Sequence, residues 1–179
     1  HKGLLGLGLV AAAASFWLLL HASHGGPVHP AAATARPDLY IEQPRWNEFD
    51  PQGRLVRQLQ ASRAEQWPGE QHARLIEPQL EIHDLRQRRW QLRAIRGRLP
   101  TDGAPLLLEQ QVVLQRGAAG TGPLLTTESL SIARDGDFVE TDTAVVLQSG
   151  NWHFSAGGLR AELGRERIEL INRVRSKHE

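Results

Sequence analysis

The 179-residue chain contains no cysteine, which excludes disulfide bonds and thiolate chemistry. Aromatic residues make up only 6% of it, so a core must be built mainly from Leu, Val, Ile and Ala. Enzyme motifs are also absent: we find no GxSxG elbow, no HExxH and no EF-hand loop. The glycine-rich run 117–122 lacks the Lys and the helix that a phosphate-binding loop requires. These absences predict a protein that is not an enzyme.

The histidines and paired carboxylates do not change this prediction. Glu81 and Asp84 are typical of exposed acids at a strand end, although such a pair could serve a hydrolase. His21, His24 and His29 lie in a stretch with no rigid frame and no carboxylate to complete a metal site. The remaining downstream histidines are spread over different segments. We therefore predict no catalytic residue, no metal and no cofactor.

The charge balance argues against nucleic acid as a partner. The formal net charge is +1, and two of the 21 basic residues, Lys2 and Arg36, lie in the first 36 residues, which contain no acid. The remainder has 19 basic against 20 acidic residues, without the basic excess that nucleic-acid binding requires. One arginine cluster is typical of a solvated hairpin face, with an anionic partner as the alternative: Arg86, Arg88, Arg89, Arg93, Arg96 and Arg98.

Residues 3–20 form the one long uncharged apolar run, near the lower length limit for a membrane-spanning helix. A cleaved signal is the alternative, with a small-residue site at 31–35. The run is longer than a usual signal core, and the small residues lie more than ten positions beyond it, which favours a span over residues 1–23. Lys2 places the N-terminus in the cytoplasm and the following chain across the membrane, in a bacterium in the periplasm.

Small residues on this segment predict a surface for close helix contact. Gly3, Gly6, Ala11 and Ser15 are the candidates, and a generic span without a partner is the alternative. Residues 24–36, HGGPVHPAAATAR, have no apolar periodicity and read as a flexible linker stiffened in part by Pro27 and Pro30.

Residues 37–179 alternate apolar and polar positions over many short segments, which is typical of β-strands with one buried face. Turn-forming pairs such as Asp102–Gly103 and Asp135–Gly136 separate the segments, and no convincing helix follows residue 36. The pattern predicts a sandwich, a barrel or an open β-roll. Periodicity alone favours a closed core over an apolar groove. The inward candidates are Leu55, Leu59, Ile76, Leu80, Leu92, Leu108, Val112, Leu130, Val145 and Phe154.

Two parts of the predicted β-domain, one turn and one strand, are candidates for contact with other proteins. Gly53 permits the turn after Asp50–Pro51 that joins the first hairpin. The segment Ile168, Leu170 and Val174 predicts a last strand at a sheet edge. Its arginines could simply blunt that edge, or the edge could accept a strand from another β-protein.

Several short motifs in a fixed order carry a family resemblance. They follow a single N-terminal span and end in the last predicted strand: PDLYIE at 37–42, FDPQGRL at 49–55, WQLRA at 90–94 with Gly97, LTTESL at 125–130, and Gly157–Gly158–Leu159. In this order and spacing the chain resembles the LptC family, the single-span component of lipopolysaccharide export, over nearly its whole length.

The resemblance implies an all-β domain, a twisted β-jellyroll or open two-sheet roll of antiparallel strands, preceded by a single transmembrane α-helix. It implies a groove that carries the acyl chains of lipopolysaccharide, lined by the inward candidates, and so favours an open groove over a closed core. One implied partner is an inner-membrane ABC transporter, which has two transmembrane subunits with ATPase subunits and is contacted by the helix and by the N-terminal edge that Gly53 supports. The other is the periplasmic bridge protein LptA at the C-terminal edge. A purely structural adaptor that joins β-domains without binding lipid is the alternative.

Overall fold

The computed structural model describes residues 36–83, 88–117 and 122–178, and all its regular structure there is β-strand. The predicted span and nearly all of the linker lie outside the described residues. Within them, no helix is long and apolar enough to cross a membrane. The prediction of an all-β, antiparallel domain is confirmed. The described strands are β1 Leu39–Glu42, β2 Arg45–Phe49, β3 Leu55–Gln60, β4 Arg63–Gln66, β5 His72–Ile76, β6 Gln79–His83, β7 Arg89–Arg93, β8 Arg96–Pro100, β9 Leu106–Arg116, β10 Leu124–Ile132, β11 Phe138–Thr141, β12 Val145–Ser149, β13 Trp152–Ala156, β14 Gly158–Glu162, β15 Arg167–Ile171 and β16 Arg175–His178.

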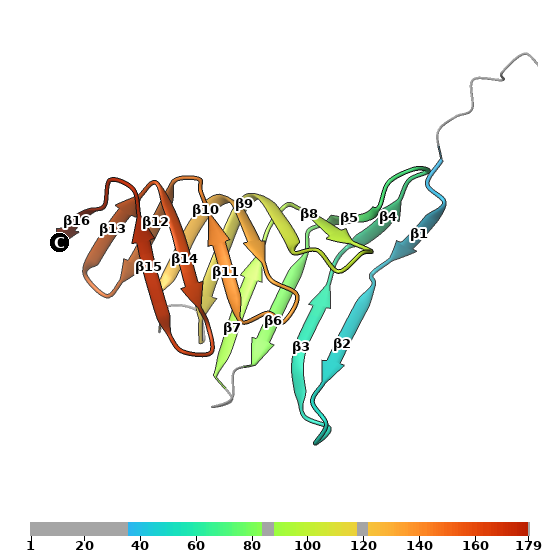
Figure 1. Cartoon of the computed structure of the whole chain (residues 1–179), viewed down its shortest axis with the longest axis horizontal. Helices are drawn as coiled ribbons and strands as arrows, with labels where there is room; N and C mark the ends of the chain where they lie inside the picture. The colour runs from blue at the N-terminus through green and yellow to red at the C-terminus, as the bar shows by residue number, and fades with distance from the viewer. Residues whose placement is uncertain (1–35, 84–87, 118–121, 179) are drawn as a thin grey trace, which may run out of the picture. The chain divides into compact units, whose positions relative to one another are not determined.

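The strands form one antiparallel meander that is folded over along its length. The first layer runs β1-β4-β5-β8-β9-β10-β11-β14-β15. The pairings off that path give a second layer, β2-β3-β6-β7-β9-β10-β12-β13-β16. Long strands β9 and β10 belong to both layers, because one half of each pairs in the first layer and the other half in the second. Figure 1 shows β1 at one end of this array of strands and β16 at the other.

Each long segment of chain crosses from one layer to the other at a bend, and we call the line of bends the crease. It passes through residues 43–44, 61–62, 77–78, 94–95, 110–111, 127–129, 142–144, 157 and 172–174. Among the described residues, seven non-glycine positions have positive φ, and six of them lie in the crease: Gln43, Glu77, Gln110, Gln111, Asn172 and Arg173. Positive φ is costly for a residue with a Cβ, so the crease is a line of enforced bends.

Hydrogen bonding continues through the crease. The Gln43 amide donates to the Ser62 carbonyl at 3.0 Å, and the Glu77 amide donates to the Ile95 carbonyl at 2.9 Å. Between β10 and β12, the buried Thr127 hydroxyl lies 2.8 Å from the Thr143 hydroxyl and donates to the Ala144 carbonyl at 2.9 Å. The bends therefore interrupt the strands without leaving these backbone groups or the buried Thr127 hydroxyl unpaired.

The bends also shift the phase of the apolar alternation. In β5 the inward position is Leu75, fully buried and paired with Ala64 and Gly97, while in β6 it is Leu80. Odd positions face inward before the bend at Glu77 and even positions after it. Ile76, which the sequence places with Leu80, is instead half-buried between exposed arginines on the outward face. This corrects the prediction that Ile76 is an inward residue.

The turn after Asp50 forms as its sequence predicts. Gly53 has φ +79° and its amide donates to the Asp50 carbonyl at 2.9 Å. The Asp50 carboxylate accepts from the backbone amides of Gln52 and Arg54, each at 2.9 Å. The Arg54 amide is the main reason that the pKa of Asp50 is lowered.

Gly158 lies where the chain passes the crease into β14, and a substitution at this residue tests how closely the chain packs there. A Cβ on this residue would lie 2.7 Å from the Thr141 carbonyl oxygen and 2.9 Å from Ile171 Cγ1. Backbone cannot give way as a flexible side chain can, so we expect Gly158→Ala to lower the free energy of unfolding by about 1–3 kcal/mol in urea titrations.

Gly164→Ala is the matched control, because its Cβ would meet nothing closer than 3.6 Å. We expect it to change the unfolding free energy by less than about 1 kcal/mol. Equal stability of the two variants would contradict a close approach at the crease.

Candidate binding groove

A continuous apolar row crosses the inner face of the second layer. Each member lies directly opposite the next on the neighbouring strand. At strand spacings of 4.7–4.9 Å the row extends over roughly 34 Å. We call it the inner row, and its members are Trp46, Leu59, Leu80, Leu92, Leu114, Leu125, Leu147 and Phe154.

The first layer presents a matching apolar face. Its inward positions begin with Ile41 and Ala64 at one end and continue through Leu75 and Leu108. Leu108 pairs with Leu130, and further along Val139 pairs with Ala161. The two faces together form one hydrophobic cluster of buried residues. The fold therefore has a single interior that runs along the whole meander.

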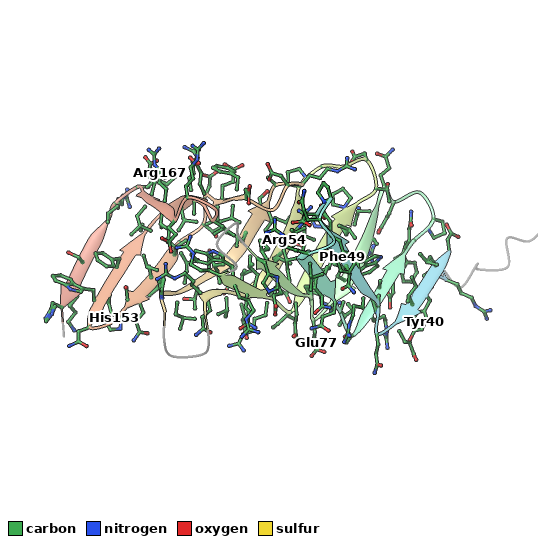
Figure 2. The ribbon with its side chains drawn as sticks, turned by 90° about the horizontal axis from the view of Figure 1, so that it is seen from below. Tyr40, Phe49, Arg54, Glu77, His153 and Arg167 are labelled. Atoms are coloured by element: carbon green, nitrogen blue, oxygen red, sulfur yellow. The ribbon has the colours of Figure 1, made fainter. Side chains whose placement is uncertain are left out.

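This interior is packed in its middle and exposed at its two ends. Leu108 and Leu130 have 0% exposure, whereas Trp46 at one end has 38% and Trp152 at the other has 46%. Trp152 stacks on Phe154 with ring centroids 6.1 Å apart. Figure 2 shows Tyr40, of β1, and His153, of β13, towards opposite ends of the domain.

The sequence-predicted lining residues fall into two groups. Seven are buried in the interior: Leu59, Leu80, Leu92, Leu108, Val112, Leu130 and Val145. Leu55 and Phe154 are half-buried towards the ends, and Ile76 lies on the outward face as described above. Sequence reasoning missed Trp46 and Leu75. Alternation continued without a break from Leu80 back to Ile76 places Leu75 on the outward face, because no local signal in the sequence marks the phase shift at Glu77.

A cavity of about 480 Å³ opens into the interior near the N-terminal end. Its apolar wall includes Leu59 and Leu80 of the inner row, with Leu99 and Ile132 from the first layer. Arg57 and Arg134 lie at its polar side. Its size and lining suit the apolar part of a small amphiphile.

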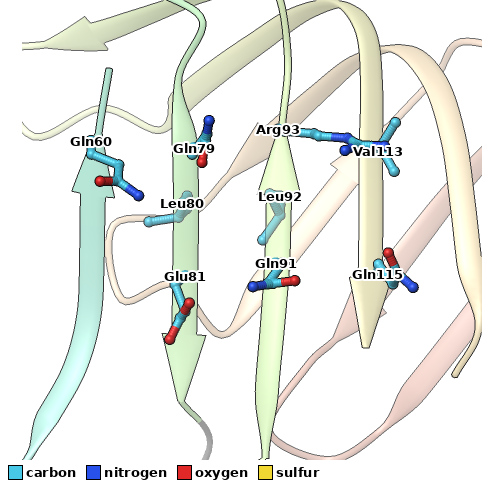
Figure 3. Close-up of a pocket in the computed structure, with 9 residues that line it drawn as sticks. All are labelled: Gln60, Gln79, Leu80, Glu81, Gln91, Leu92, Arg93, Val113 and Gln115. Carbon is cyan, nitrogen blue, oxygen red and sulfur yellow. The ribbon is translucent and has the colours of Figure 1, made fainter. Parts of the chain in front are cut away.

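A second hollow, of about 160 Å³, lies over β3, β6, β7 and β9 and is drawn in Figure 3. Polar side chains dominate its lining, with the amides of Gln60, Gln79, Gln91 and Gln115 beside Arg93. Gln60 pairs with Gln79, and Gln91 with Gln115, on neighbouring strands. This hollow can offer hydrogen bonds, but it has no grouping suited to catalysis.

The two layers meet again on the side away from the crease, which we call the margin. There Arg57 of β3 donates to the carbonyl of Arg134 in the β10–β11 turn of the first layer and pairs with Glu48 of β2. The guanidinium fits against Gly136, where a Cβ would lie 2.8 Å from Arg57 Cδ. Arg57 thus links the layers across the margin beside the cavity.

A second link involves Glu166, in the turn between β14 and β15 of the first layer. Its Oε1 accepts from Arg116, at the end of β9, and pairs with Arg88, just before β7. Both arginines belong to the second layer. The hydrogen bond from Arg88 is the main reason that the pKa of Glu166 is lowered, and the charges of both arginines add to the shift.

The predicted partner-binding residues lie at turns and ends. Gly53 occupies the β2–β3 turn, and Ile168 and Leu170 of β15 pack against the core. The last predicted strand is divided into β15 and β16. Val174 lies in the crease between them and is 50% exposed. The candidates Gly3, Gly6, Ala11 and Ser15 lie outside the described residues.

In the part of the chain that the structure describes, no group of three or more His, Cys, Asp or Glu side chains could hold a metal ion. The most extensive feature of the described residues is the apolar interior, which presents hydrocarbon side chains along the meander.

A family model described as "Lipopolysaccharide-assembly, LptC-related" matches residues 6–179. A comparison with curated proteins finds no match.

The link at Glu166 has a testable pH dependence. Because its pKa is lowered in the folded state, its ion pair stabilises the fold above the unfolded-state pKa of about 4.3 and is lost as pH falls through the folded-state pKa. Wild type should therefore be more stable than Glu166→Gln at pH 6, and the difference should shrink between pH 5 and 3.

Urea titrations across this pH range measure the difference, since other carboxylates contribute equally to both proteins. Glu140→Gln, which removes a pair with Arg160 on the outer face, is the control. A wild-type advantage that stays constant down to pH 3 would contradict the assignment.

Proposed function

The chain belongs to the LptC family, which takes part in lipopolysaccharide transport, and from this premise we propose that its interior conducts lipopolysaccharide acyl chains. The observation that supports this most is the inner row, an uninterrupted line of apolar contacts between the two ends of the domain. Exposing hydrocarbon to water costs about 0.8 kcal/mol per CH₂, and a continuous apolar path removes that cost without any reaction.

In this proposal the domain is a twisted β-jellyroll, like its family, and it passes lipid from one partner to the next without catalysing a reaction. Apolar side chains remain exposed at both ends, as expected if another apolar surface continues the path there: Leu39, Ile41 and Trp46 at one, Trp152 at the other. In this proposal an inner-membrane ABC transporter supplies lipid at the N-terminal end. The periplasmic bridge protein LptA accepts it at the C-terminal edge, β15–β16.

The segment before the domain has a separate part in the proposal. Residues 1–23 span the inner membrane with the N-terminus in the cytoplasm, and residues 24–36 tether the domain in the periplasm. The small residues Gly3, Gly6, Ala11 and Ser15 allow close contact with transporter helices. A span of this kind keeps the N-terminal end of the domain near the membrane that supplies the lipid.

A structural adaptor is the second candidate function, and the packed middle of the interior favours it. Side chains with 0–2% exposure fill the space between the layers from Leu75 to Leu159. An adaptor would join neighbouring β-domains edge to edge through the same terminal strands and keep this core dry. The two functions differ in whether lipid enters between the layers.

A photo-reactive amino acid at Leu80 distinguishes them. Leu80 belongs to the inner row and lines the cavity, whereas the adjacent Glu81 faces outward beside His83 and Arg89. In membranes that contain the full chain and its transporter, we expect ATP-dependent crosslinking to lipopolysaccharide from position 80 and little from position 81. Crosslinking from position 81 but not from position 80 would reject the conduit and leave the adaptor.

The C-terminal edge can be tested by removing residues 175–179. This deletes β16, which pairs only with β13 among the described strands and contributes no fully buried side chain. We expect capture of the bridge protein to be lost while the thermal transition remains cooperative. Unchanged capture by the shortened chain would place the contact elsewhere.

A further inference from the structure

The packed interior raises the question of how a lipid enters it. Beyond the cavity that exposes Leu59 and Leu80, a hydrocarbon chain can reach the middle of the inner row only if the two layers move apart at the margin, because the crease joins them by continuous backbone. The contacts that tie the margin together therefore control access. At the Glu166 link, one carboxylate of the first layer pairs with two arginines of the second layer.

Backbone geometry marks Glu166 as specially placed. It is the one non-glycine residue with positive φ among the described residues that lies outside the crease, at φ +54°. The turn is held by hydrogen bonds from the Arg165 amide to the Glu162 carbonyl and from the Glu166 amide to the Leu163 carbonyl, each 3.2 Å. A residue with a Cβ keeps this conformation only where its surroundings stabilise it, and here the hydrogen bonds of the turn hold the backbone.

Arg116 also lies beside the interior. Arg116 is positioned over the ring of Trp90, 5.9 Å from its centroid. Trp90 is 2% exposed, and its indole N–H has no hydrogen-bond partner among the described residues. Buried donors are normally paired, so an unpaired N–H in the ring that Arg116 covers points to an acceptor that this closed state does not provide.

A phosphate group fits these donors better than Glu166 does. Oε1 of Glu166 contacts both guanidinium groups, so the two arginines share one carboxylate oxygen where a larger anion would offer each of them an oxygen of its own. A phosphate monoester offers three acceptor oxygens and a charge of −1.5 to −2, roughly twice that of a carboxylate. It could therefore bind Arg88 and Arg116 together and leave an oxygen for a further donor.

We propose that Glu166 is an internal substitute for a ligand phosphate: it closes the margin by occupying an anion site of Arg88 and Arg116, and the phosphate of an amphiphile displaces it as the layers separate. This rests on the conduit function proposed above and assigns its regulation to three residues. The acyl chains would then enter against Trp90 and the inner row while the head group stays at the margin.

Spin labels measure the opening directly. The chain has no cysteine, so cysteines at Arg89 and Arg165 label the two sides of the margin without background. In the full chain in detergent, we expect one short distance for wild type and a longer population in Glu166→Gln. Diphosphoryl lipid A should lengthen the wild-type distance, and its dephosphorylated form should not. Glu140→Gln should behave as wild type.

The affinities for the same two lipids distinguish an anion site, which binds the ligand phosphate, from an ion pair that only holds the two layers together. Glu166→Gln and the double variant Arg88→Gln/Arg116→Gln both break the link, but they should have opposite effects on affinity. We expect Glu166→Gln to bind diphosphoryl lipid A about fivefold more tightly than wild type, and the double variant about tenfold more weakly. Neither should change affinity for the dephosphorylated lipid.

Three outcomes overturn the inference. They are an affinity that Glu166→Gln leaves unchanged or lowers, a distance that diphosphoryl lipid A leaves unchanged, and a distance that dephosphorylated lipid A lengthens equally. In each case wild type still binds lipid, so the conduit function stands. If wild type binds neither lipid, the conduit function itself fails.

Discussion

The fold depends on one constraint, that a meander of antiparallel strands must bury the apolar face of both its halves against each other. The crease meets this constraint by bending every long segment at its middle, at residues such as Gln43, Glu77 and Asn172 that adopt positive φ. The cost of those conformations is offset by burial, since each bend turns two short half-strands into facing parts of one core. Because the bends lie in one line, the core becomes a long interior with two ends rather than a closed globule.

This geometry explains why the interior contains a continuous apolar row that runs from one end of the domain to the other. Directly opposed positions on successive strands give the inner row without a break from Trp46 to Phe154, as strand pairing alone requires. The same pairing leaves apolar side chains at both ends with nothing beyond them in the described chain. Packing in the middle and exposure at the ends are therefore two results of one architecture. A conduit needs only that the layers separate, and the margin is where charged side chains resist this.

Much of the fold and of the candidate groove can be predicted from the sequence, and the features that cannot be predicted depend on tertiary contacts. Period-two alternation and turn residues are local signals, so the all-β class, the turn at Gly53 and seven buried lining positions could be predicted. The phase shift at Glu77 depends on a bend whose cause is tertiary, and so Ile76 was assigned to the inner face in place of Leu75. Arg116 and Glu166 are 50 positions apart. Their contact follows from how the layers cross, which no short motif encodes.

The central claim is that the inner row is the route of the acyl chains. An experimental structure of the full chain with lipopolysaccharide bound tests it most directly. The account predicts hydrocarbon density between the two layers, in contact with Leu59, Leu80 and Leu92, with the margin wider than it is here. Density confined to the outer face of the second layer, over an interior as tightly packed as in the unliganded chain, would contradict it.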